Sequence, residues 1–433
     1  MIDKIRSILK QANIDIWNIR ELSTSSRELF FIRKDLDMNR AKKVRSYTLT
    51  VYRDFQDEGN SCKGSATLKL TPSMDESEIR AKVEKAYYAA SFVKNPFYPL
   101  PSPGKTERNG QQEKSHDFQK SLDDLSGLTK SLYKNDVHEL GGINSAEIFL
   151  SSNSYRILNS EGIDVSYSKN RKDIELICDW KEEGADVELY NMFSFSDNCP
   201  ELVEEECRKQ IEHCRLRAQA SPATELKSVN VILGGNAIID LMGFYLSQTT
   251  AKNKYEKLSS AEKGKVFQGD NVRGDLISLT LDPAIPGSSY ASPFDTDGIS
   301  LKQIPLLEKG VVRQFHGSLQ YSHYLNIPPT GKIKSFTVAR GDGRFEELKK
   351  EPYVEILTFS DFQMDNLTGD FGGEIRLALY FDGKKVSPIT GATLSACLFD
   401  IQDEIYLSGD IIRKENYQGP KSLMFKNGHI AGS

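Results

Sequence analysis

The sequence predicts an α+β fold in two domains. The N-terminal domain is expected to combine helices with an antiparallel meander sheet, and the C-terminal domain to be β-rich, a curved sheet or sandwich with a few helices. A chain of 433 residues is too long for one ordinary hydrophobic core. Between residues 147 and 179, short β-forming segments alternate with short polar turns, which indicates antiparallel neighbours. In the second half, a strand, a tight glycine turn and a return strand recur at 304–315, 375–386 and 421–430.

The first elements can be placed from their patterns. Residues 2–12 carry an apolar helical stripe, and residues 28–33, 47–53 and 65–71 are rich in β-branched or aromatic side chains, as strands are. A helix should follow the capping-box sequence Ser73-Met-Asp-Glu76, because Ile79 and Val83 begin an apolar stripe behind it.

A proline-rich segment interrupts this first domain. Residues 95–117 contain four prolines and a polar tract, which predicts an irregular insertion. The same domain should continue with a helix over 122–133 and strands over 147–151, 154–159, 163–168 and 174–179. Pro200 should open a helix that ends near Ala220, before Ser221-Pro222. We therefore expect domains at 1–221 and 222–433.

The second domain is expected to contain two marked hairpins. Asp382-Gly383 and Asn427-Gly428 are typical of two-residue hairpin turns, in which both central residues need positive φ. Residues 229–247 predict a strand, a glycine turn and an amphipathic helix.

Composition excludes several classes of function. The net charge of −5 argues against a nucleic-acid-binding surface, which normally needs a basic face. The N-terminus alternates charged and apolar residues, unlike a signal peptide. The longest apolar run, 237–246, is about half of the ~20 residues that span a bilayer. We expect a cytoplasmic chain with no membrane partner.

The cysteines and histidines offer weak candidates for a metal site. Six cysteines are too sparse for a disulfide framework, and Cys207 and Cys214 share a predicted helix face with Ile211, which favours core packing. His316 and His323 are seven residues apart, too far for chelation on a straight helix. They are either functional or hydrogen-bonded structural histidines.

An acidic turn and a glycine-rich segment are the other candidates. Asp295-Thr-Asp-Gly298 lacks the carboxylates that a calcium loop needs before and after it, so a turn is favoured. Thr368, Gly369, Asp370, Phe371, Gly372 and Gly373 could expose backbone groups to an extended peptide or an interface. The alternative is a glycine-permitted bulge or turn beside a strand.

Several of these segments resemble the signature of the TldD/PmbA family, once called modulators of DNA gyrase. The match is carried by Thr368-Gly-Asp-Phe-Gly-Gly-Glu-Ile375, Pro388-Ile-Thr-Gly-Ala-Thr-Leu394, Asp295-Thr-Asp-Gly298 and Leu306-Leu-Glu-Lys-Gly-Val311. Residues 152–162 resemble the family's N-terminal hairpin. The resemblance extends from about residue 28 to the end.

The resemblance also implies what this chain lacks. The catalytic branch of the family carries His-Glu-x-x-x-His on the helix after the strand at 229, and a cysteine ligand near the C-terminus. Here residues 238–243 contain no histidine, Asp240 is the only ionisable residue on that stretch, and 410–433 contain no cysteine. A catalytic zinc site needs three protein ligands. The resemblance thus implies the metal-free PmbA (TldE) branch, with no catalytic or metal-binding residue here and zinc only in a partner chain.

Two functions remain open at this point. The first is a non-catalytic subunit of a TldD-type zinc metallopeptidase that acts on flexible peptides, bound to a TldD-like partner in a heterodimer. The second is a homodimeric protein that binds peptides or a small ligand without peptidase activity. A modulator of DNA topology is disfavoured by the acidic balance.

Overall fold

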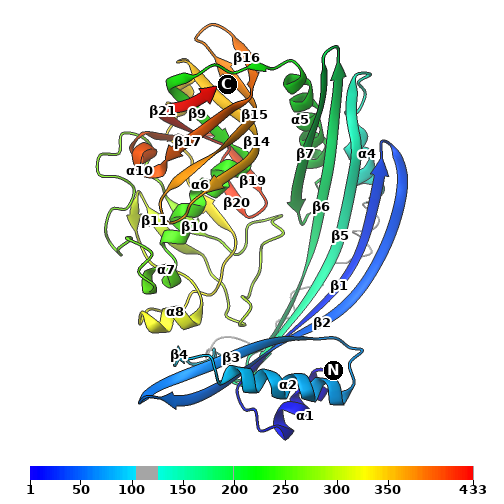
Figure 1. Cartoon of the computed structure of the whole chain (residues 1–433), viewed down its shortest axis with the longest axis vertical. Helices are drawn as coiled ribbons and strands as arrows, with labels where there is room; N and C mark the ends of the chain where they lie inside the picture. Colours follow the sequence, from blue (N-terminus) through cyan, green and yellow to red (C-terminus); the bar gives the residue numbers. More distant parts are fainter. Residues whose placement is uncertain (104–124, 198, 433) are drawn as a thin grey trace.

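A computed structural model describes residues 1–103, 125–197 and 199–432. It consists of a long, curved N-terminal sheet with helices on it, and a C-terminal part built around a barrel that lies beside the sheet (Figure 1). The predicted α+β class is confirmed, including the antiparallel N-terminal sheet and the curved C-terminal sheet. The expected domain boundary near residue 222 stays a prediction.

The N-terminal sheet has the strand order β4-β3-β2-β1-β5-β6-β7, and every neighbouring pair is antiparallel. Its strands are β1 (Trp17–Ile32), β2 (Asp35–Asp57), β3 (Asn60–Leu70), β4 (Asn95–Pro96), β5 (Gly141–Asn159), β6 (Asp164–Glu182) and β7 (Ala185–Phe195).

These strands are much longer than the sequence predicted. The four short strands expected between 147 and 179 are two continuous strands, β5 and β6, so the turns expected near 152 and 170 were wrong. Polar residues 151–154 pair with β1 on one side and with β6 on the other. Since ladder hydrogen bonds on both sides satisfy the backbone, the strand continues where side-chain polarity suggested a turn.

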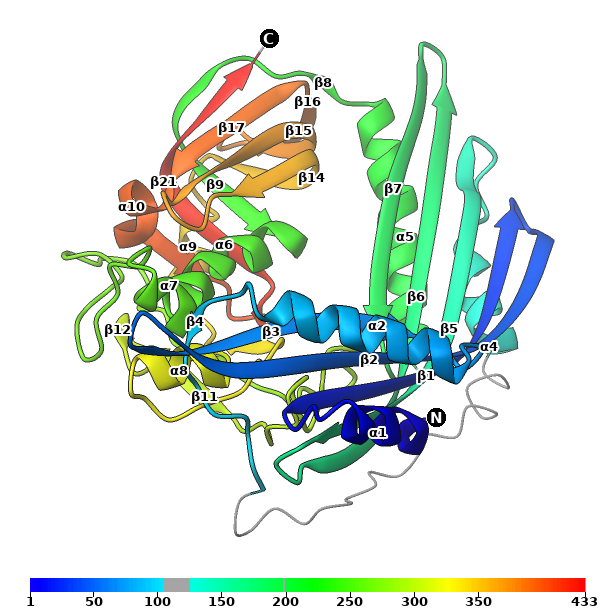
Figure 2. The same cartoon turned by 60° about the horizontal axis from the view of Figure 1, so that its bottom comes forward.

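Two pairs of helices cover this sheet at its opposite ends (Figure 2). They are α1 (Ile2–Gln11) with α2 (Glu76–Ala90), and α4 (Leu125–Tyr133) with α5 (Pro200–Ala218). The predicted capping box was two residues off: Asp75 caps α2, its carboxylate accepts from the Glu78 N–H, and the Glu78 side chain accepts from the Asp75 N–H. The cysteine stripe is confirmed as core, because Cys207, Ile211 and Cys214 are buried together.

The proline-rich segment is only partly described. Asn95–Pro96 forms the short edge strand β4 against β3, whereas residues 104–117 of the predicted insertion lie outside the described residues. The predicted helix over 122–133 is α4, and its first three expected positions also fall outside the described part.

The C-terminal part contains a closed barrel that the sequence analysis did not anticipate. Strands β14-β9-β21-β17-β15 pair in that order, and β15 pairs back with β14, which closes the ring. The strands of this sheet are β8 (Ser221–Pro222), β9 (Leu226–Gly234), β14 (Tyr353–Met364), β15 (Asp370–Phe381), β16 (Val386–Thr390), β17 (Ala392–Cys397), β18 (Ile405–Leu407) and β21 (Ser422–Gly432).

A second sheet packs on the barrel through the shared core. Its order is β12-β11-β10-β13-β20-β19, and its strands are β10 (Leu279–Leu281), β11 (Ile304–Glu308), β12 (Val311–Val312), β13 (Phe336–Val338), β19 (Ile411–Lys414) and β20 (Tyr417–Pro420). The helices of this part are α6 (Gly235–Gln248), α7 (Ala251–Tyr255), α8 (Leu319–Tyr324), α9 (Arg344–Leu348), α10 (Leu398–Ile401) and the 3₁₀ turn η1 (Gln402–Glu404).

One predicted hairpin was wrong. Asn427-Gly428 lies inside the continuous strand β21, where the register against β9 shifts between Phe425 and Gly428. Asn427 has a φ of 58°, so the pair does supply the left-handed residue that its sequence suggested. It forms a bulge, which bends a barrel strand, where a hairpin turn was expected. Asp382-Gly383 does connect β15 to β16, as predicted.

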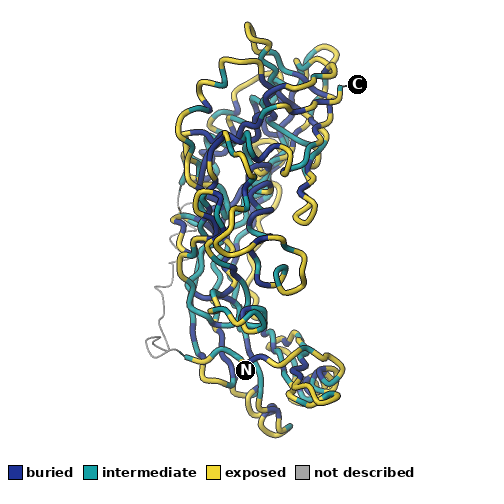
Figure 3. The backbone as a smooth tube through the Cα atoms, turned by 90° about the vertical axis from the view of Figure 1, so that its left-hand side faces the viewer, coloured by how far each residue is buried: buried dark blue, intermediate teal, exposed yellow. Residues whose placement is uncertain are grey.

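Burial follows this architecture. Buried positions concentrate in the C-terminal part and along the N-terminal sheet, and exposed positions gather at loops and ends (Figure 3). None of the helices among the described residues has the length and apolar character required to cross a bilayer.

Barrel closure predicts a stability effect at Gly373. A Cβ there would meet the carbonyl oxygen of Asp361 on β14, so Gly373→Ala should lower the free energy of unfolding by about 1–3 kcal/mol. Gly409→Ala, at an exposed glycine with open space around it, should change it by less than about 0.5 kcal/mol. Urea unfolding of both variants is the measurement, and equal midpoints would contradict the close strand approach.

Candidate functional site

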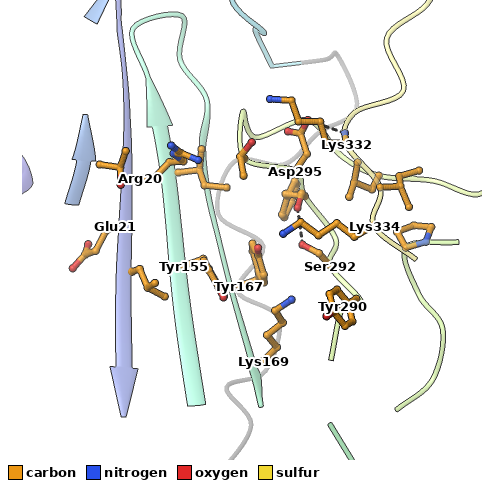
Figure 4. A pocket seen from close by; sticks show the side chains of 18 of the residues that line it. Arg20, Glu21, Tyr155, Tyr167, Lys169, Tyr290, Ser292, Asp295, Lys332 and Lys334 are labelled. Atoms are coloured by element: carbon orange, nitrogen blue, oxygen red, sulfur yellow. Dashed lines mark hydrogen bonds between the residues drawn. The ribbon is translucent and has the colours of Figure 1, made fainter. Parts of the chain in front are cut away.

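A cavity of about 380 Å³ lies between the N-terminal sheet and the C-terminal part. Figure 4 shows residues of β1, β5 and β6 on one side and of the segment 283–301 and the loop 332–334 on the other. Its lining residues are Arg20, Glu21, Leu22, Ser46, Thr48, Lys69, Tyr155, Ile157, Tyr167, Lys169, Pro283, Tyr290, Ser292, Phe294, Asp295, Thr296, Leu301, Lys332, Ile333 and Lys334. The volume falls within the range of small-molecule sites.

Aromatic rings form the wall on the sheet side. Tyr155 on β5 and Tyr167 on β6 face each other directly in the strand register. Their rings stack with centroids 4.7 Å apart and planes at 14°. Phe294 reaches Tyr167 from the C-terminal part, with ring centroids 6.4 Å apart, and joins it in one small core cluster. The two parts of the molecule therefore share apolar packing at this wall.

Lys169 is the most unusual ionisable group here. Its ammonium donates to the carbonyl oxygens of Ser289 (3.0 Å) and Ala291 (3.3 Å), and lies 5.9 Å from the centre of the Tyr155 ring. Burial, and then the positive charges of Lys334 and Arg171, lower the pKa of Lys169 from 10.5 to about 8. A cavity lysine whose pKa is lowered towards neutral pH is a common feature of functional sites.

The opposite wall is a turn organised by Asp295. One carboxylate oxygen of Asp295 accepts from the N–H groups of Asp297 and Ile299, and the other accepts from the Lys332 N–H. Burial raises the pKa of Asp295, and the nearby Asp297 carboxylate adds to this. The turn interpretation of Asp295-Thr-Asp-Gly298 fits these contacts, since the Asp295 oxygens already hold the backbone of the loop together.

The cavity carries an excess of positive charge. Of the described lining residues, five are basic (Arg20, Lys69, Lys169, Lys332 and Lys334) and two are acidic (Glu21 and Asp295). Glu21 already pairs with Arg45 at 3.3 Å and accepts from the Tyr47 hydroxyl, and Lys332 pairs with Asp297 at 3.2 Å.

The helix that the family resemblance associates with metal ligands in the catalytic branch is α6. Its apolar face, including Ile238, Leu241 and Tyr245, is fully buried in the C-terminal core. Asp240 lies on the outward face, and partial burial together with the nearby Glu415 carboxylate raises its pKa. Across the described ranges, 1–103, 125–197 and 199–432, no cluster of three or more His, Cys, Asp or Glu side chains could hold a metal ion.

The glycine-rich segment 368–373 leads into the barrel. Thr368 and Gly369 form a turn held by the Asp365 carboxylate, and β15 begins at Asp370. Gly372 and Gly373 pair with β17 on one side and β14 on the other. Their strand edges are thus occupied by neighbouring strands of the barrel. Peptide or interface contact by Thr368, Gly369, Asp370, Phe371, Gly372 and Gly373 stays a prediction.

The two histidines are not brought together as a chelating pair. His316 is buried, its Nε2 lies 3.1 Å from the Leu246 carbonyl oxygen, and burial lowers its pKa to about 4. His323 lies on α8, with its ring 6.5 Å from that of Phe97. His316 is therefore a neutral, hydrogen-bonded core residue at physiological pH.

Residues 226–432 match the model of the PmbA/TldA metallopeptidase C-terminal domain. This match, together with the solved structures described below, supports the TldD/PmbA family. An uncharacterized protein of Methanocaldococcus jannaschii is 22% identical over 324 residues, which cover 72% of this chain and 74% of that protein.

Solved structures share the fold over the full length. A candidate modulator of a DNA gyrase from Thermotoga maritima has a TM-score of 0.73 at 17% identity, covering 99% of both chains. TldE from Thermococcus kodakarensis has a TM-score of 0.77 at 15% identity, covering 100% of both. A candidate modulator of DNA gyrase from Bacteroides thetaiotaomicron has a TM-score of 0.77 at 14% identity, covering 100% of this chain and 99% of that one.

Sequence reasoning missed the cavity, because its walls come from segments more than a hundred residues apart. One local signal was available. Tyr167, Lys169 and Arg171 alternate along the chain, so in a strand they share one face. Two cations beside a tyrosine on a single strand face indicate a partner surface, here the segment 289–291.

The nearby positive charge of Lys334 predicts a measurable lowering of the pKa of Lys169. In protein whose lysines carry isotope-labelled methyl groups, the Lys169 resonance, assigned with Lys169→Arg, should titrate with a pKa of about 8. Lys334→Ala should raise this pKa, because it removes a like charge. Lys350→Ala, at an exposed lysine outside the cavity, should leave it unchanged. Titration of Lys169 near 10.5 would contradict its burial.

Proposed function

We propose that this protein is a non-catalytic subunit of a TldD-type zinc metallopeptidase. The observation that carries the proposal is a PmbA/TldA metallopeptidase domain whose α6 helix contains no histidine. A hydrolytic zinc centre needs three protein ligands and an open position for water. A TldD-like partner would supply the zinc, its ligands and the general base, while this chain would form one wall of a chamber for flexible peptides.

An exposed apolar surface supports a partner on the N-terminal sheet. Ile32, Leu36 and Met38 lie near the end of the β1–β2 hairpin and are exposed by 42–59%, and Val44 lies further along β2 and is exposed by 45%. Exposed apolar side chains that lie together are typical of protein–protein contact surfaces. We propose that this hairpin end takes part in the contact with the metallopeptidase subunit.

The partner is testable with a tagged chain isolated from its own cells. Native mass spectrometry should find a complex of this 48.7 kDa chain with a partner of similar size and one zinc ion. The complex should hydrolyse unstructured peptides, and a chelator should abolish the activity, whereas this chain alone should do neither. Zinc near one equivalent and peptide hydrolysis in the isolated chain would overturn the proposal.

A matched pair of variants tests the contact surface. Leu36→Asp should lower recovery of the partner at least about tenfold, because it would bury an unpaired charge at the interface. Val386→Asp, at a similarly exposed residue on the C-terminal part, should leave recovery unchanged. Equal recovery with both variants would exclude the hairpin end as the contact.

The cavity favours the second candidate function. It is complete within one chain, so binding a small ligand needs no partner subunit. A metal-free species at about twice 48.7 kDa in the same experiment would favour a homodimeric ligand-binding protein.

A further inference from the structure

We propose that the cavity between the N-terminal sheet and the 283–301 segment is a binding site for a small organic anion, one carboxylate-like group attached to an apolar body. This site uses only residues of this chain, so the proposal goes beyond the proposed subunit function and does not depend on it.

Charge is the first argument. Among the described residues, none of Arg20, Lys69, Lys169 and Lys334 forms an ion pair. Both acidic groups of the lining are already engaged, Glu21 by Arg45 and Asp295 by three backbone N–H groups. A cationic ligand would meet like charge, and the described lining residues offer it no available carboxylate. An anion would be attracted by the uncompensated charge, most strongly where solvent is partly excluded.

The position of the anionic group follows from the two coupled lysines. Lys169 and Lys334 both point into the space between the strands and the 290–295 segment (Figure 4). The Lys169 ammonium has three donors, of which two are used by the carbonyl oxygens of Ser289 and Ala291. The third remains for a ligand. An anion between the two ammonium groups would replace their mutual repulsion by attraction, and would raise the pKa of Lys169 towards its usual value.

The rest of the lining selects an apolar body. Tyr155 and Tyr167 present a stacked pair of rings, and Leu22, Ile157 and Leu301 add aliphatic surface. Such walls with a few fixed polar groups are typical of small-molecule sites. A hydrated inorganic anion would make no apolar contact with these aromatic and aliphatic side chains. A volume of about 380 Å³ suits a molecule about the size of an aromatic amino acid derivative.

Access is through the basic edge. Lys69, Lys332 and Lys334 are exposed, whereas Tyr167 and Asp295 are buried deeper in the wall. The charged edge can therefore attract an anion before its apolar body contacts the tyrosines. The same chemistry fits a free small acid and the carboxylate end of a peptide with an aromatic last residue.

The test uses the full chain and calorimetric titration. The probes are N-acetylphenylalanine, its uncharged amide, and a tripeptide ending in phenylalanine with a free carboxylate. The acid should bind at least about tenfold more tightly than the amide, because charge-assisted hydrogen bonds would be lost. Lys334→Ala should weaken binding of the acid by about the same factor, and Lys334→Arg should retain it. The Lys334 side chain donates no hydrogen bond within the described part of the chain, so its removal should not impair folding.

The outcomes separate the proposal from its rivals. Lys350→Ala is the matched control and should bind like the unaltered chain. Stronger binding of the tripeptide than of the small acid would identify a peptide end as the source, and the reverse would identify a free metabolite. Equal affinity for acid and amide, no saturable binding, or unchanged binding in Lys334→Ala would overturn the proposal. None of these results depends on a metallopeptidase partner.

Discussion

The arrangement of the whole molecule depends on the contact between strand β6 and the segment 287–291. Lys169 donates to the carbonyl oxygens of Ser289 and Ala291. Arg171 on the same strand face donates to the Ser289 hydroxyl and lies 5.4 Å from the centre of the Tyr290 ring. Beyond the end of β7, the Ser196 N–H donates to the Gly287 carbonyl oxygen, at 2.9 Å. The bonds from Lys169 and Ser196 use backbone carbonyls outside any strand, and together with the Arg171 contacts they hold the C-terminal part against the sheet.

The cavity is a consequence of that contact. The sheet, including β6, forms one wall of the cavity, and the segment 287–291 is bound to β6. The Asp295 turn, which follows this segment along the chain, forms the opposite wall. Phe294 then packs on Tyr167 and closes the apolar side. Lys169 both joins the two parts and lines the cavity, and its lowered pKa follows from this position. Burial is the largest cause of the lowering, so the fold sets the pKa of Lys169 before any ligand binds.

Local patterns in the sequence were sufficient for the fold class and for most helices. The helices at residues 2–11 and 200–218 were predicted closely, because apolar periodicity and Pro200 act locally. The lengths of β5 and β6 could not be predicted, because Lys169 and Arg171 interrupt the apolar pattern of β6. Their polar groups bind the other part of the molecule, which the sequence does not reveal. Asn427-Gly428 shows the same limit: its left-handed backbone was predictable, but whether it formed a hairpin or a bulge depended on pairing with β9.

The candidate site was predicted less well than the fold. Asp240 was placed correctly on a helix that follows a strand and a glycine turn. Asp295 was singled out only as part of a turn, and the cavity itself was missed, because charge and aromatic character at distant positions do not indicate that the residues meet. The barrel closure was missed for the same reason, since the pairing of β14 with β15 and β9 joins segments that propensity alone cannot order.

Apolar packing holds α6 in the C-terminal core, and this packing requires no histidine on the helix. Ile238, Leu241 and Tyr245 are fully buried and anchor the helix in the barrel core. Asp240 lies on the other face, where a side chain contributes little to packing. The hydrophobic stabilisation of α6 therefore comes from its buried face and needs no metal ligand. The fold that matches a metallopeptidase domain is held by this packing, and the basic and aromatic cavity lies elsewhere, where the two parts of the molecule meet.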